Sequence, residues 1–418
     1  MKHISIEASL LKELNKLMKI AIISGRFQPK FGGMSGHAYQ VARHFSRKGA
    51  QVRIYARRGE CSQLTEENIT SIPLLTHRFP ILDAFLLRLI MIRFQPDWIH
   101  ITEAGLAYRC LTKRFPSLVR VVGNDFLRPW SGFNLPLRFF LYRIPSFKLR
   151  QKIKSFEIFL RRKIVINRLK KVPIITNSEW TFKKLVDNGI PKKNIHILTG
   201  GIDTKIFKPY TKKSTLRKEL NLDENKLVFI TVANLIERKG HDVVIMALSH
   251  LVEKYEHFYY VIVGDGEYRP VLEKLVNENS IAEYVRFTEK INQQEVARYY
   301  QASDIYIQIS RDVEIIPGIT DNAETMGRTF IEAGACALPV IASNIGGIPS
   351  VVRDGYNGIL VQNPRNIKEI TDKMMLLANN KDLRVQLGTN GVERSKTEFS
   401  WDIICRKIED KLKLMIAK

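Results

Sequence analysis

Short apolar runs alternate with longer amphipathic segments along the chain from residue 18 onward. The first run (19–24) is followed by a loop that contains glycines (25–36), a helical pattern (37–48) and a second apolar run (51–56). An uninterrupted apolar run is typical of a parallel strand that is buried on both faces. The opening pattern therefore predicts a strand–helix–strand unit within a parallel sheet.

Later apolar runs in the first half predict further strands, and polar residues follow two of them directly. These runs are 98–101, 119–122 and 172–177, and a helix is expected from Glu179. The segments Thr102-Glu103 and Gly123-Asn124-Asp125 follow the first two runs, and Gly32-Gly33 follows the strand at 19–24. Ligands of open α/β sheets bind at this carboxyl edge of the strands, although by themselves these residues favour turns.

The same alternation restarts at Leu227, after a lysine-rich polar stretch at 206–218. Strands are predicted at 227–232, 259–263, 285–287, 305–309 and 340–343, with helices at 242–255, 269–279, 294–302 and 328–336. This alternation indicates a second parallel sheet with helices on both faces.

We therefore expect an α/β chain with two domains, 18–205 and 206–399. Residues 1–17 look helical, but Met18 would equally make a natural start of the chain, so an extra helix and a misplaced start codon are both open. The last helix, within 400–418, is basic and amphipathic and could pack back on the first domain.

The composition is that of a globular protein with a strong positive charge. Hydrophobic residues make up 45% of the chain, and no apolar run approaches the roughly 18–20 residues that span a bilayer. The N-terminus does not resemble a secretory signal, and scattered cysteines without ligand-like spacing are typical of reduced cytosolic thiols. The formal net charge of +24 points to a polyanionic partner such as nucleic acid, an anionic membrane face or phosphorylated substrates.

Nearly half of that charge lies in the segment 138–171. The segment contains twelve Lys or Arg residues and a single acid, Glu157, with six aromatic residues interleaved. Such a pattern is typical of helices that lie on a membrane surface, although a solvated basic face over a packed aromatic face is a common alternative. No nucleic-acid-binding motif accompanies it. We favour an anionic membrane surface as the partner of 138–171, and no nucleic acid.

Candidate chemistry is concentrated in the segment 321–343, where a polar loop leads into a helix and then into a short strand. Backbone N–H groups at 327–329, together with the helix dipole, would form an anion site. Glu324 and Glu332 flank that site, and carboxylates in this position typically accept hydrogen bonds from hydroxyl groups of a ribose or a sugar. An isolated pair would more simply be a surface acid and a helix-terminal acid.

The order of several motifs resembles the family-4 retaining glycosyltransferases of the GT-B fold, the glycosyl transferases group 1. The motifs are Leu235–Gly240, Val263–Gly266, Tyr299–Ser310, the Glu324/Glu332 pair, Gly346-Gly347, Asp354-Gly355 and, in the first half, Gly32-Gly33, Ser178 and Gly201–Pro209. The resemblance covers roughly residues 18–405. It implies two Rossmann-like parallel-sheet domains that face each other across a cleft, an acceptor domain at 18–205 and a nucleotide-sugar donor domain at 206–399.

The resemblance also implies a role for each matching residue. Lys239 would neutralise the donor diphosphate, Glu332 would bind the ribose, and Glu324 would bind the transferred sugar. The expected catalytic residues are Glu324, Lys239 and Asn124, and the expected donor-binding residues are Gly33, Asn234, Arg238, Gly327, Arg328, Thr329 and Glu332. Asn124 and Asn234 depart from the His and Arg that the family often has, which puts sugar and acceptor specificity in question.

The leading hypothesis is a metal-independent, anomer-retaining glycosyltransferase that moves a sugar from a UDP- or GDP-linked donor to a glycan or lipid-linked acceptor. No metal or other cofactor is expected, because no Asp-x-Asp motif occurs and a lysine with backbone donors can balance a departing diphosphate. We expect a cytoplasmic enzyme, peripheral on the inner face of the membrane, in the assembly of a glycolipid or a surface polysaccharide such as lipopolysaccharide. The alternatives are a nucleotide-sugar epimerase or phosphorylase of the same fold, and a non-catalytic basic nucleic-acid binder.

Overall fold

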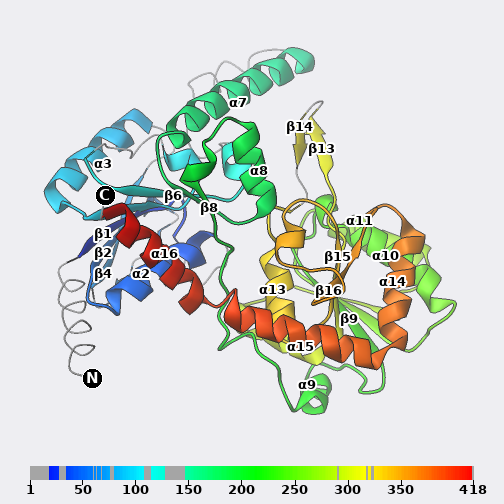
Figure 1. Cartoon of the computed structure of the whole chain (residues 1–418). Coiled ribbons are helices and arrows are strands. Elements are labelled where there is room, and N and C mark those ends of the chain that lie inside the picture. The colour runs from blue at the N-terminus through cyan, green and yellow to red at the C-terminus, as the bar shows by residue number, and fades with distance from the viewer. Residues whose placement is uncertain are drawn as a thin grey trace, which may run out of the picture. The chain divides into compact units, whose positions relative to one another are not determined.

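The structure of the chain is a computed structural model (Figure 1). It describes residues 18–27, 34–59, 61–62, 64–66, 68–75, 80–107, 114–127, 146–289, 291–316, 319–321 and 324–416. The predicted extension 1–17, the donor-binding candidate Gly33 and the first part of the basic segment, 138–145, lie outside the described residues, as does the side chain of Asn124.

The chain divides into two compact units. Unit 1 is Met1–Leu198 together with Ile404–Lys418, and unit 2 is Thr199–Ile403. The division after Leu198 falls a few residues before the boundary that the sequence predicts.

In its described residues, unit 1 has an eight-stranded sheet with the order β3-β4-β2-β1-β5-β6-β7-β8. The strands are β1 (Lys19–Ile23), β2 (Gln51–Arg57), β3 (Thr65–Glu66), β4 (Ile69–Leu75), β5 (Trp98–Ile101), β6 (Ser117–Val121), β7 (Ile174–Thr176) and β8 (Ile195–Ile197). Neighbouring strands pair in parallel, except that β3 and β4 pair antiparallel. The apolar run of β1 is buried throughout, from Ile20 to Ile23, as the sequence predicts for a central parallel strand.

Helices pack around this sheet (Figure 1). They are α2 (Met34–Ser46), α3 (Pro80–Phe94), η1 (Ala104–Leu106), α5 (Asn124–Leu127), α7 (Phe147–Leu169), α8 (Glu179–Asp187), η2 (Lys192–Asn194) and the end of α16 (Trp401–Ile416). The oxygen of Ser178 accepts a hydrogen bond from the Thr181 N–H at 3.2 Å, which caps α8. Helix α3 was not predicted, because apolar side chains lie on both its buried and its exposed sides and hide the helical period.

Glu409 holds the C-terminal part of α16 against the end of α2 and the turn that follows it. Its carboxylate accepts hydrogen bonds from Lys48 at 2.5 Å and from His44 at 3.0 Å. Burial alone would raise the pKa of Glu409, but these hydrogen bonds and one from Lys413 outweigh burial and lower the pKa to about 2. The end of the chain is therefore anchored in unit 1 by a carboxylate that is ionised at neutral pH.

Unit 2 has a parallel six-stranded sheet among its described residues, with the order β11-β10-β9-β12-β15-β16. The strands are β9 (Leu227–Val232), β10 (Phe258–Val263), β11 (Val285–Thr288), β12 (Ile305–Gln308), β15 (Val340–Ser343) and β16 (Gly358–Val361), and the separate antiparallel hairpin is β13 (Val313–Ile316) with β14 (Ile319–Asp321). The helices are α9 (Lys213–Glu219), η3 (Glu237–Lys239), α10 (His241–Val252), α11 (Arg269–Glu278), α12 (Gln293–Ala302), α13 (Arg328–Ala335), η4 (Ile348–Ser350), α14 (Ile367–Asn379) and α15 (Lys381–Thr397).

The core of unit 2 has a layer on each face of its sheet. Val228 and Ile230 of β9 belong to one hydrophobic cluster, whereas Leu227 and Phe229 belong to another. Alternate residues of a strand point to opposite faces, so both faces of β9 are covered by helices. This arrangement explains why the strand is apolar at every position.

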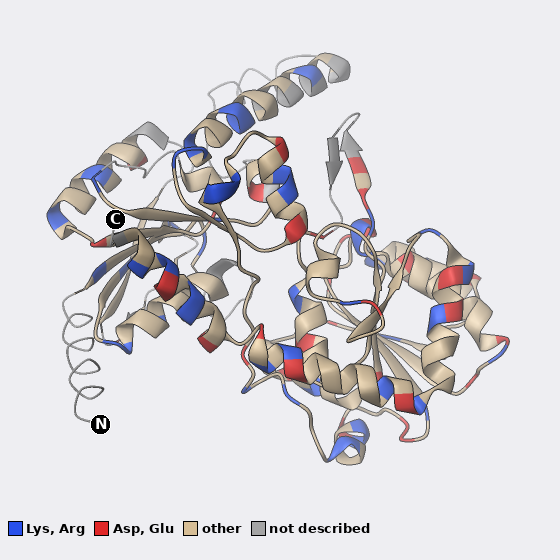
Figure 2. Ribbon diagram, in the orientation of Figure 1, with Lys and Arg blue, Asp and Glu red and all other residues tan. Residues whose placement is uncertain are grey.

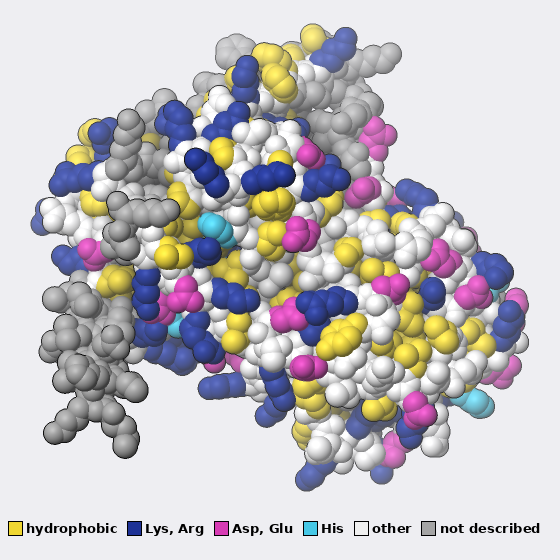
Figure 3. Space-filling model, viewed as in Figure 1, with side chains coloured by type: hydrophobic (Ala, Val, Ile, Leu, Met, Phe, Trp, Pro, Cys, Tyr) yellow, Lys and Arg dark blue, Asp and Glu magenta, His cyan; other side chains and the backbone are white. Residues whose placement is uncertain are grey.

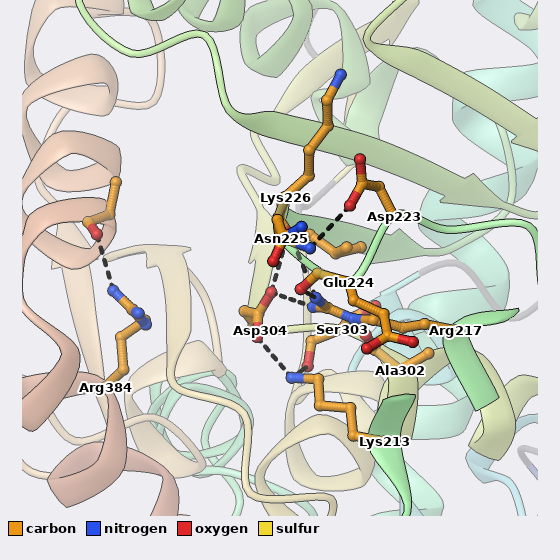
Figure 4. A network of polar contacts seen from close by, with 12 residues as sticks. Lys213, Arg217, Asp223, Glu224, Asn225, Lys226, Ala302, Ser303, Asp304 and Arg384 are labelled. Carbon is orange, nitrogen blue, oxygen red and sulfur yellow. Dashed lines mark hydrogen bonds and ion pairs between the residues drawn. The ribbon is translucent and has the colours of Figure 1, made fainter. Parts of the chain in front are cut away.

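A buried polar network joins α9 to the sheet of unit 2 (Figure 4). The carboxylate of Asp304 pairs with Lys213 and Arg217 of α9, and it also accepts the Val228 N–H at 2.7 Å. Burial opposes ionisation of Asp304, but the two cations prevail and lower its pKa. The lysine-rich stretch that the sequence placed between the domains is therefore attached to the strand edge by paired charges.

Candidate active site

The strand order of unit 2 reverses between β9 and β12, so the loops that follow these two strands diverge. Strand β9 pairs with β10 on one side and with β12 on the other, so the chain connections leave the carboxyl ends of β9 and β12 in opposite directions. Such a reversal of strand order is where open α/β sheets bind ligands. Apart from Gly33, which lies outside the described residues, the residues predicted to bind the donor belong to the loop after β9 and to the start of α13.

Gly240 allows the loop after β9 to lie against the end of β12. Its backbone has a φ of +72°, and a Cβ there would collide with the carbonyl oxygen of Ile309. The Arg311 N–H also donates to the carbonyl oxygen of Arg238 at 2.9 Å. These contacts hold η3, which carries Arg238 and Lys239, against the end of β12.

Lys239 and Glu324 form the central ion pair of the site. The ammonium of Lys239 contacts Oε2 of Glu324, and Arg238 lies 3.9 Å from the same oxygen. All three side chains are largely buried, between 14% and 18% exposed. Burial tends to raise the pKa of Glu324, but Lys239, Arg238 and a hydrogen bond from Gln308 outweigh it and lower the pKa. The structure thus brings together two predicted catalytic residues and one predicted donor-binding residue.

The N-terminus of α13 follows Glu324 closely and has no side-chain cap. Gly327 occupies the cap position with a φ of +84°, where a Cβ would collide with the ring of Phe330. The backbone N–H groups at the start of α13, on Arg328 and Thr329, therefore receive no side-chain hydrogen bond from the cap residue. Because they lie at the positive end of the helix dipole, they suit an anionic group.

Glu332 is buried one turn further along α13. Its Oε1 accepts a hydrogen bond from Nε of Arg328 at 3.0 Å, and its Oε2 accepts one from the Tyr300 hydroxyl at 3.4 Å. Burial, followed by the charge of Glu332, raises the pKa of Tyr300, so this hydroxyl stays a donor. Both oxygens of the expected ribose-binding residue are thus oriented by neighbours.

Polar side chains at the end of β12 complete the site, and the sequence reasoning did not single them out. The amide of Gln308 donates to Ser310 at 2.8 Å and accepts from the Tyr306 hydroxyl at 2.7 Å. The Thr329 hydroxyl also donates to Gln308, at 3.3 Å. In the sequence, the Tyr299–Ser310 motif marks this stretch without assigning a role to each of its residues.

Arg311 is a second residue that the sequence reasoning missed. Its guanidinium binds both carboxylate oxygens of Asp242, at 2.8 and 2.6 Å, and Oε1 of Glu237 at 3.3 Å. The side chain is only 5% exposed. Arg311 therefore ties the end of β12 to both ends of the segment that carries Arg238 and Lys239.

The other predicted site residues take less defined places. Asn234 follows β9 and is exposed, and Asn124 begins α5 in unit 1.

Across the described part of the chain, no three His, Cys, Asp or Glu side chains gather as they would around a metal ion. Within the same residues, no helix is both long and apolar enough to cross a membrane.

Comparisons with known proteins match both halves of the chain. The family model "Glycosyltransferase Family 4" matches residues 31–206, and "Glycosyl transferases group 1" matches residues 212–394. A GDP-mannose-dependent alpha-(1-6)-phosphatidylinositol monomannoside mannosyltransferase of Mycobacterium tuberculosis is 29% identical over 237 residues, which are 56% of this chain and 60% of that protein. The alpha-monoglucosyldiacylglycerol synthase of Acholeplasma laidlawii is 25% identical over 287 residues, 64% of this chain and 68% of that protein.

A solved structure supports the same fold. Sucrose-phosphate synthase from Thermosynechococcus elongatus superposes with a TM-score of 0.76 and 20% identity, over 96% of this chain and 99% of that one. The two parallel-sheet units are thus the domains of a GT-B fold, as the sequence predicts.

Proposed function

The chain belongs to the family-4, group 1 glycosyltransferases of the GT-B fold, and from this premise we propose that it transfers a sugar from a UDP- or GDP-linked donor to a glycan or lipid-linked acceptor. The observation that carries the proposal is the cluster of Lys239, Arg238 and Glu324 beside the uncapped start of α13. It brings together positive charge for a diphosphate and a carboxylate for hydroxyl groups.

The charges of the site suit the departure of a nucleoside diphosphate. As the bond to the sugar breaks, negative charge grows on the diphosphate, and Lys239, Arg238 and the N–H groups of Arg328 and Thr329 would stabilise it. Lys239 is already in the site before the donor binds, paired with Glu324, and the diphosphate would take the place of that carboxylate. This supports a reaction in which protein groups take the place of a metal ion.

We further propose that the reaction retains the configuration at the anomeric carbon. The carboxylate of Glu324 lies beside Lys239 and Arg238, and we assign to it the role of accepting hydrogen bonds from sugar hydroxyls and not that of attacking the anomeric carbon. The acceptor hydroxyl would then attack on the face that the diphosphate leaves, with its proton passing to a phosphate oxygen. Glu332, oriented by Arg328 and Tyr300, would bind the ribose.

The surface of unit 1 supports a membrane-borne acceptor. Helix α7 exposes Leu149, Phe156, Phe159 and Leu160, and Phe156 is 65% exposed. Lys and Arg residues are distributed along the same helix (Figure 2), and apolar and basic side chains are interspersed there on the surface (Figure 3). The packed-aromatic alternative for this segment therefore does not hold for Phe156 and Phe159.

Helix α3 of the same unit repeats this pattern. Leu82, Phe85, Leu89 and Ile92 are between 41% and 59% exposed and recur at helical spacing. Exposed apolar stripes accompanied by Lys and Arg are typical of helices that lie in the interface of an anionic bilayer. We propose that α7 and α3 bring the enzyme to a membrane where its lipid-linked acceptor resides, on the cytoplasmic face.

The test of the transfer reaction is donor turnover by the full chain with a panel of UDP- and GDP-sugars, with and without EDTA. We expect one donor to be hydrolysed slowly in the absence of acceptor, with no effect of EDTA, and we expect Glu324→Ala to abolish this turnover. Lys254→Ala is the control, because Lys254 is an exposed lysine of unit 2. Binding of no nucleotide sugar by the folded wild-type protein would refute the proposal, and loss of turnover with EDTA would refute its metal-independent form.

A further inference from the structure

The two ends of unit 2 are joined to each other by backbone hydrogen bonds. Unit 2 begins with the segment 199–203, here termed the entry segment, and ends with 399–403, the exit segment. The Ile202 N–H donates to the carbonyl oxygen of Phe399 at 2.9 Å, and the Trp401 N–H donates to the carbonyl oxygen of Ile202 at 3.3 Å. A change in the order of one segment therefore reaches the other.

The entry segment also contacts the loop that precedes α13. The Gly200 N–H donates to the sulfur of Met326 at 3.0 Å, and a Cβ on Gly200 would lie 3.0 Å from Cε of the same side chain. Met326 is 6% exposed and belongs to the same hydrophobic cluster as Ile202 and Phe399. The two segments and Met326 thus share one core within unit 2.

Met326 stands between two parts of the chain that are assigned to the donor. Glu324 lies two residues before it, and Gly327, the cap residue of α13, follows it directly. A displacement of Met326 would move the backbone on both sides of it. The position of the Glu324 carboxylate and of the first N–H groups of α13 therefore depends on how Met326 is held.

The loop at Glu324 and Met326 is held at two points of different strength. At the first point, the Gly347 N–H donates to the carbonyl oxygen of Glu324 at 2.8 Å, and a Cβ on Gly346 would collide with that oxygen. At the second point, Met326 receives the Gly200 N–H. A thioether is a weak acceptor on a flexible side chain. The attachment to the entry segment is therefore the more adaptable of the two.

We propose that Met326 is a positioning residue, through which the entry segment keeps Glu324 and the start of α13 in the arrangement that binds the donor. This inference rests on the proposed function, because it concerns how the donor site of the same transfer is ordered. Coupling between two parts of a protein is reciprocal in its binding free energies. If an ordered entry segment favours the donor, the bound donor must in turn order the entry segment.

The test of this reciprocity is hydrogen–deuterium exchange of the full chain, with and without saturating UDP or GDP. We expect the preferred nucleotide to slow exchange of the amides at 199–203 and 399–401 by at least about fivefold, the lower end of usual couplings. Exchange within α14, which packs in the other hydrophobic cluster of unit 2, should change little. Isothermal titration calorimetry gives the nucleotide affinity of each variant in parallel.

Two substitutions of Met326 separate its contact with Gly200 from its bulk. Met326→Ala removes both and should weaken nucleotide binding by about fivefold or more, with no slowing of exchange in the entry segment. Met326→Leu keeps most of the apolar volume, a change that cores usually tolerate, but it offers the Gly200 N–H no acceptor. It should therefore fold and still lose the response of the entry segment. Met326→Leu decides if Met326→Ala does not fold.

Met374→Ala is the matched control, because Met374 is a fully buried methionine of α14 in the other cluster. It should lower the unfolding free energy as Met326→Ala does, but keep the wild-type nucleotide affinity and exchange response. Equal loss of affinity in Met374→Ala and Met326→Ala would overturn the inference, as would a wild-type response in Met326→Leu.

The wild type distinguishes this inference from the proposed function. If it binds and turns over a nucleotide sugar but exchange of the entry segment does not slow, the positioning role of Met326 alone is wrong. If the folded wild type binds no nucleotide, the proposed function is wrong and the inference fails with it.

Discussion

The ammonium of Lys239 is paired with the carboxylate of Glu324, 85 residues further along the chain. In the absence of a donor, each of these largely buried groups satisfies the charge of the other. A bound diphosphate would compete for Lys239 and release a carboxylate oxygen for sugar hydroxyls. The ion pair would therefore be exchanged for two contacts with the donor. Lys239 would bind the diphosphate, and Glu324 would bind hydroxyl groups of the sugar.

This exchange predicts opposite effects of two substitutions on the affinity for UDP and GDP, which carry no sugar. Glu324→Gln removes the competitor of the phosphate, so the affinity for the preferred nucleotide should rise a few-fold, while sugar transfer falls by roughly 100-fold because a hydrogen bond to a charged group is lost. Lys239→Ala should lower both the affinity for the nucleotide and the rate of sugar transfer. Isothermal titration calorimetry measures the affinities. If both variants shift nucleotide affinity in the same direction, the exchange does not occur.

Arg311 is predicted to position Lys239 through η3. Arg311→Ala leaves Asp242, which is 17% exposed, without its cation. Breaking a buried pair in this way costs about 3–5 kcal/mol. We expect a clear loss of unfolding free energy in urea and a higher KM for the donor, with a smaller change in kcat. Compared with Arg311→Ala, Arg311→Lys should recover part of the lost unfolding free energy. Its donor KM should stay closer to that of Arg311→Ala than to that of the wild type, because lysine cannot bind two oxygens in the same fork geometry.

The control for Arg311 is the exposed pair of Arg298 and Glu219, whose side chains are 45% and 52% exposed. Arg298→Ala should change the unfolding free energy by less than about 1 kcal/mol, as exposed pairs usually do. Equal destabilisation by Arg298→Ala and Arg311→Ala would contradict the role assigned to burial. A donor KM unchanged in Arg311→Ala would contradict the positioning role.

Much of the fold could be predicted from the sequence, because buried parallel strands are apolar at every position and so stand out from their surroundings. The predicted runs at 227–232 and 340–343 coincide with β9 and β15. Strand β4 escaped prediction because it lies near the edge of its sheet and mixes buried with exposed positions. Strands of this kind show neither a continuous apolar run nor a clean alternation.

The candidate site was predictable to the extent that its residues belong to local motifs. Lys239, Glu324 and Glu332 each stand in a recognisable stretch, and the structure brings Lys239 and Glu324 into contact. The role of Arg311 depends on contacts with residues about 70 positions earlier in the chain. Glu103 likewise approaches Gly25 only because β5 and β1 are neighbouring strands of one sheet. Contacts of this range follow from strand order, which single motifs do not specify.

Asp125 is predicted to make stability depend on pH in the mildly acidic range. Burial raises its pKa to about 6 in the folded chain, above the ordinary value of about 3.9. The folded state therefore binds the proton more tightly than the unfolded state does. The resulting stabilisation is complete below about pH 4 and is lost as the pH rises through about 6.

The measurement for Asp125 compares urea unfolding of the wild type and of Asp125→Asn between pH 4.5 and 7. The wild type should lose stability relative to the variant as the pH rises, by up to about 3 kcal/mol for a two-unit shift of pKa. Asp187→Asn, at an exposed position of the same unit, should differ from the wild type by an amount that does not vary with pH. If the difference in unfolding free energy between the wild type and Asp125→Asn also does not vary with pH, the pKa of Asp125 is not raised.

The exposed phenylalanines of α7 lead to a prediction about membrane binding. Phe156 and Phe159 are 65% and 61% exposed, and burying a phenylalanine side chain contributes about 1.5–3 kcal/mol. The full chain should therefore sediment with vesicles that contain phosphatidylglycerol at low salt, and the double variant Phe156→Ser, Phe159→Ser should bind at least tenfold more weakly.

Binding of the wild type should also weaken as salt rises, because the lysines and arginines of α7 contribute through a screened attraction. Val385→Ser removes a similarly exposed apolar side chain from α15 of unit 2 and should leave vesicle binding unchanged. If the wild type does not bind anionic vesicles at low salt, the proposed membrane location is wrong. The proposed transfer reaction at Lys239 and Glu324 would not be affected by that result.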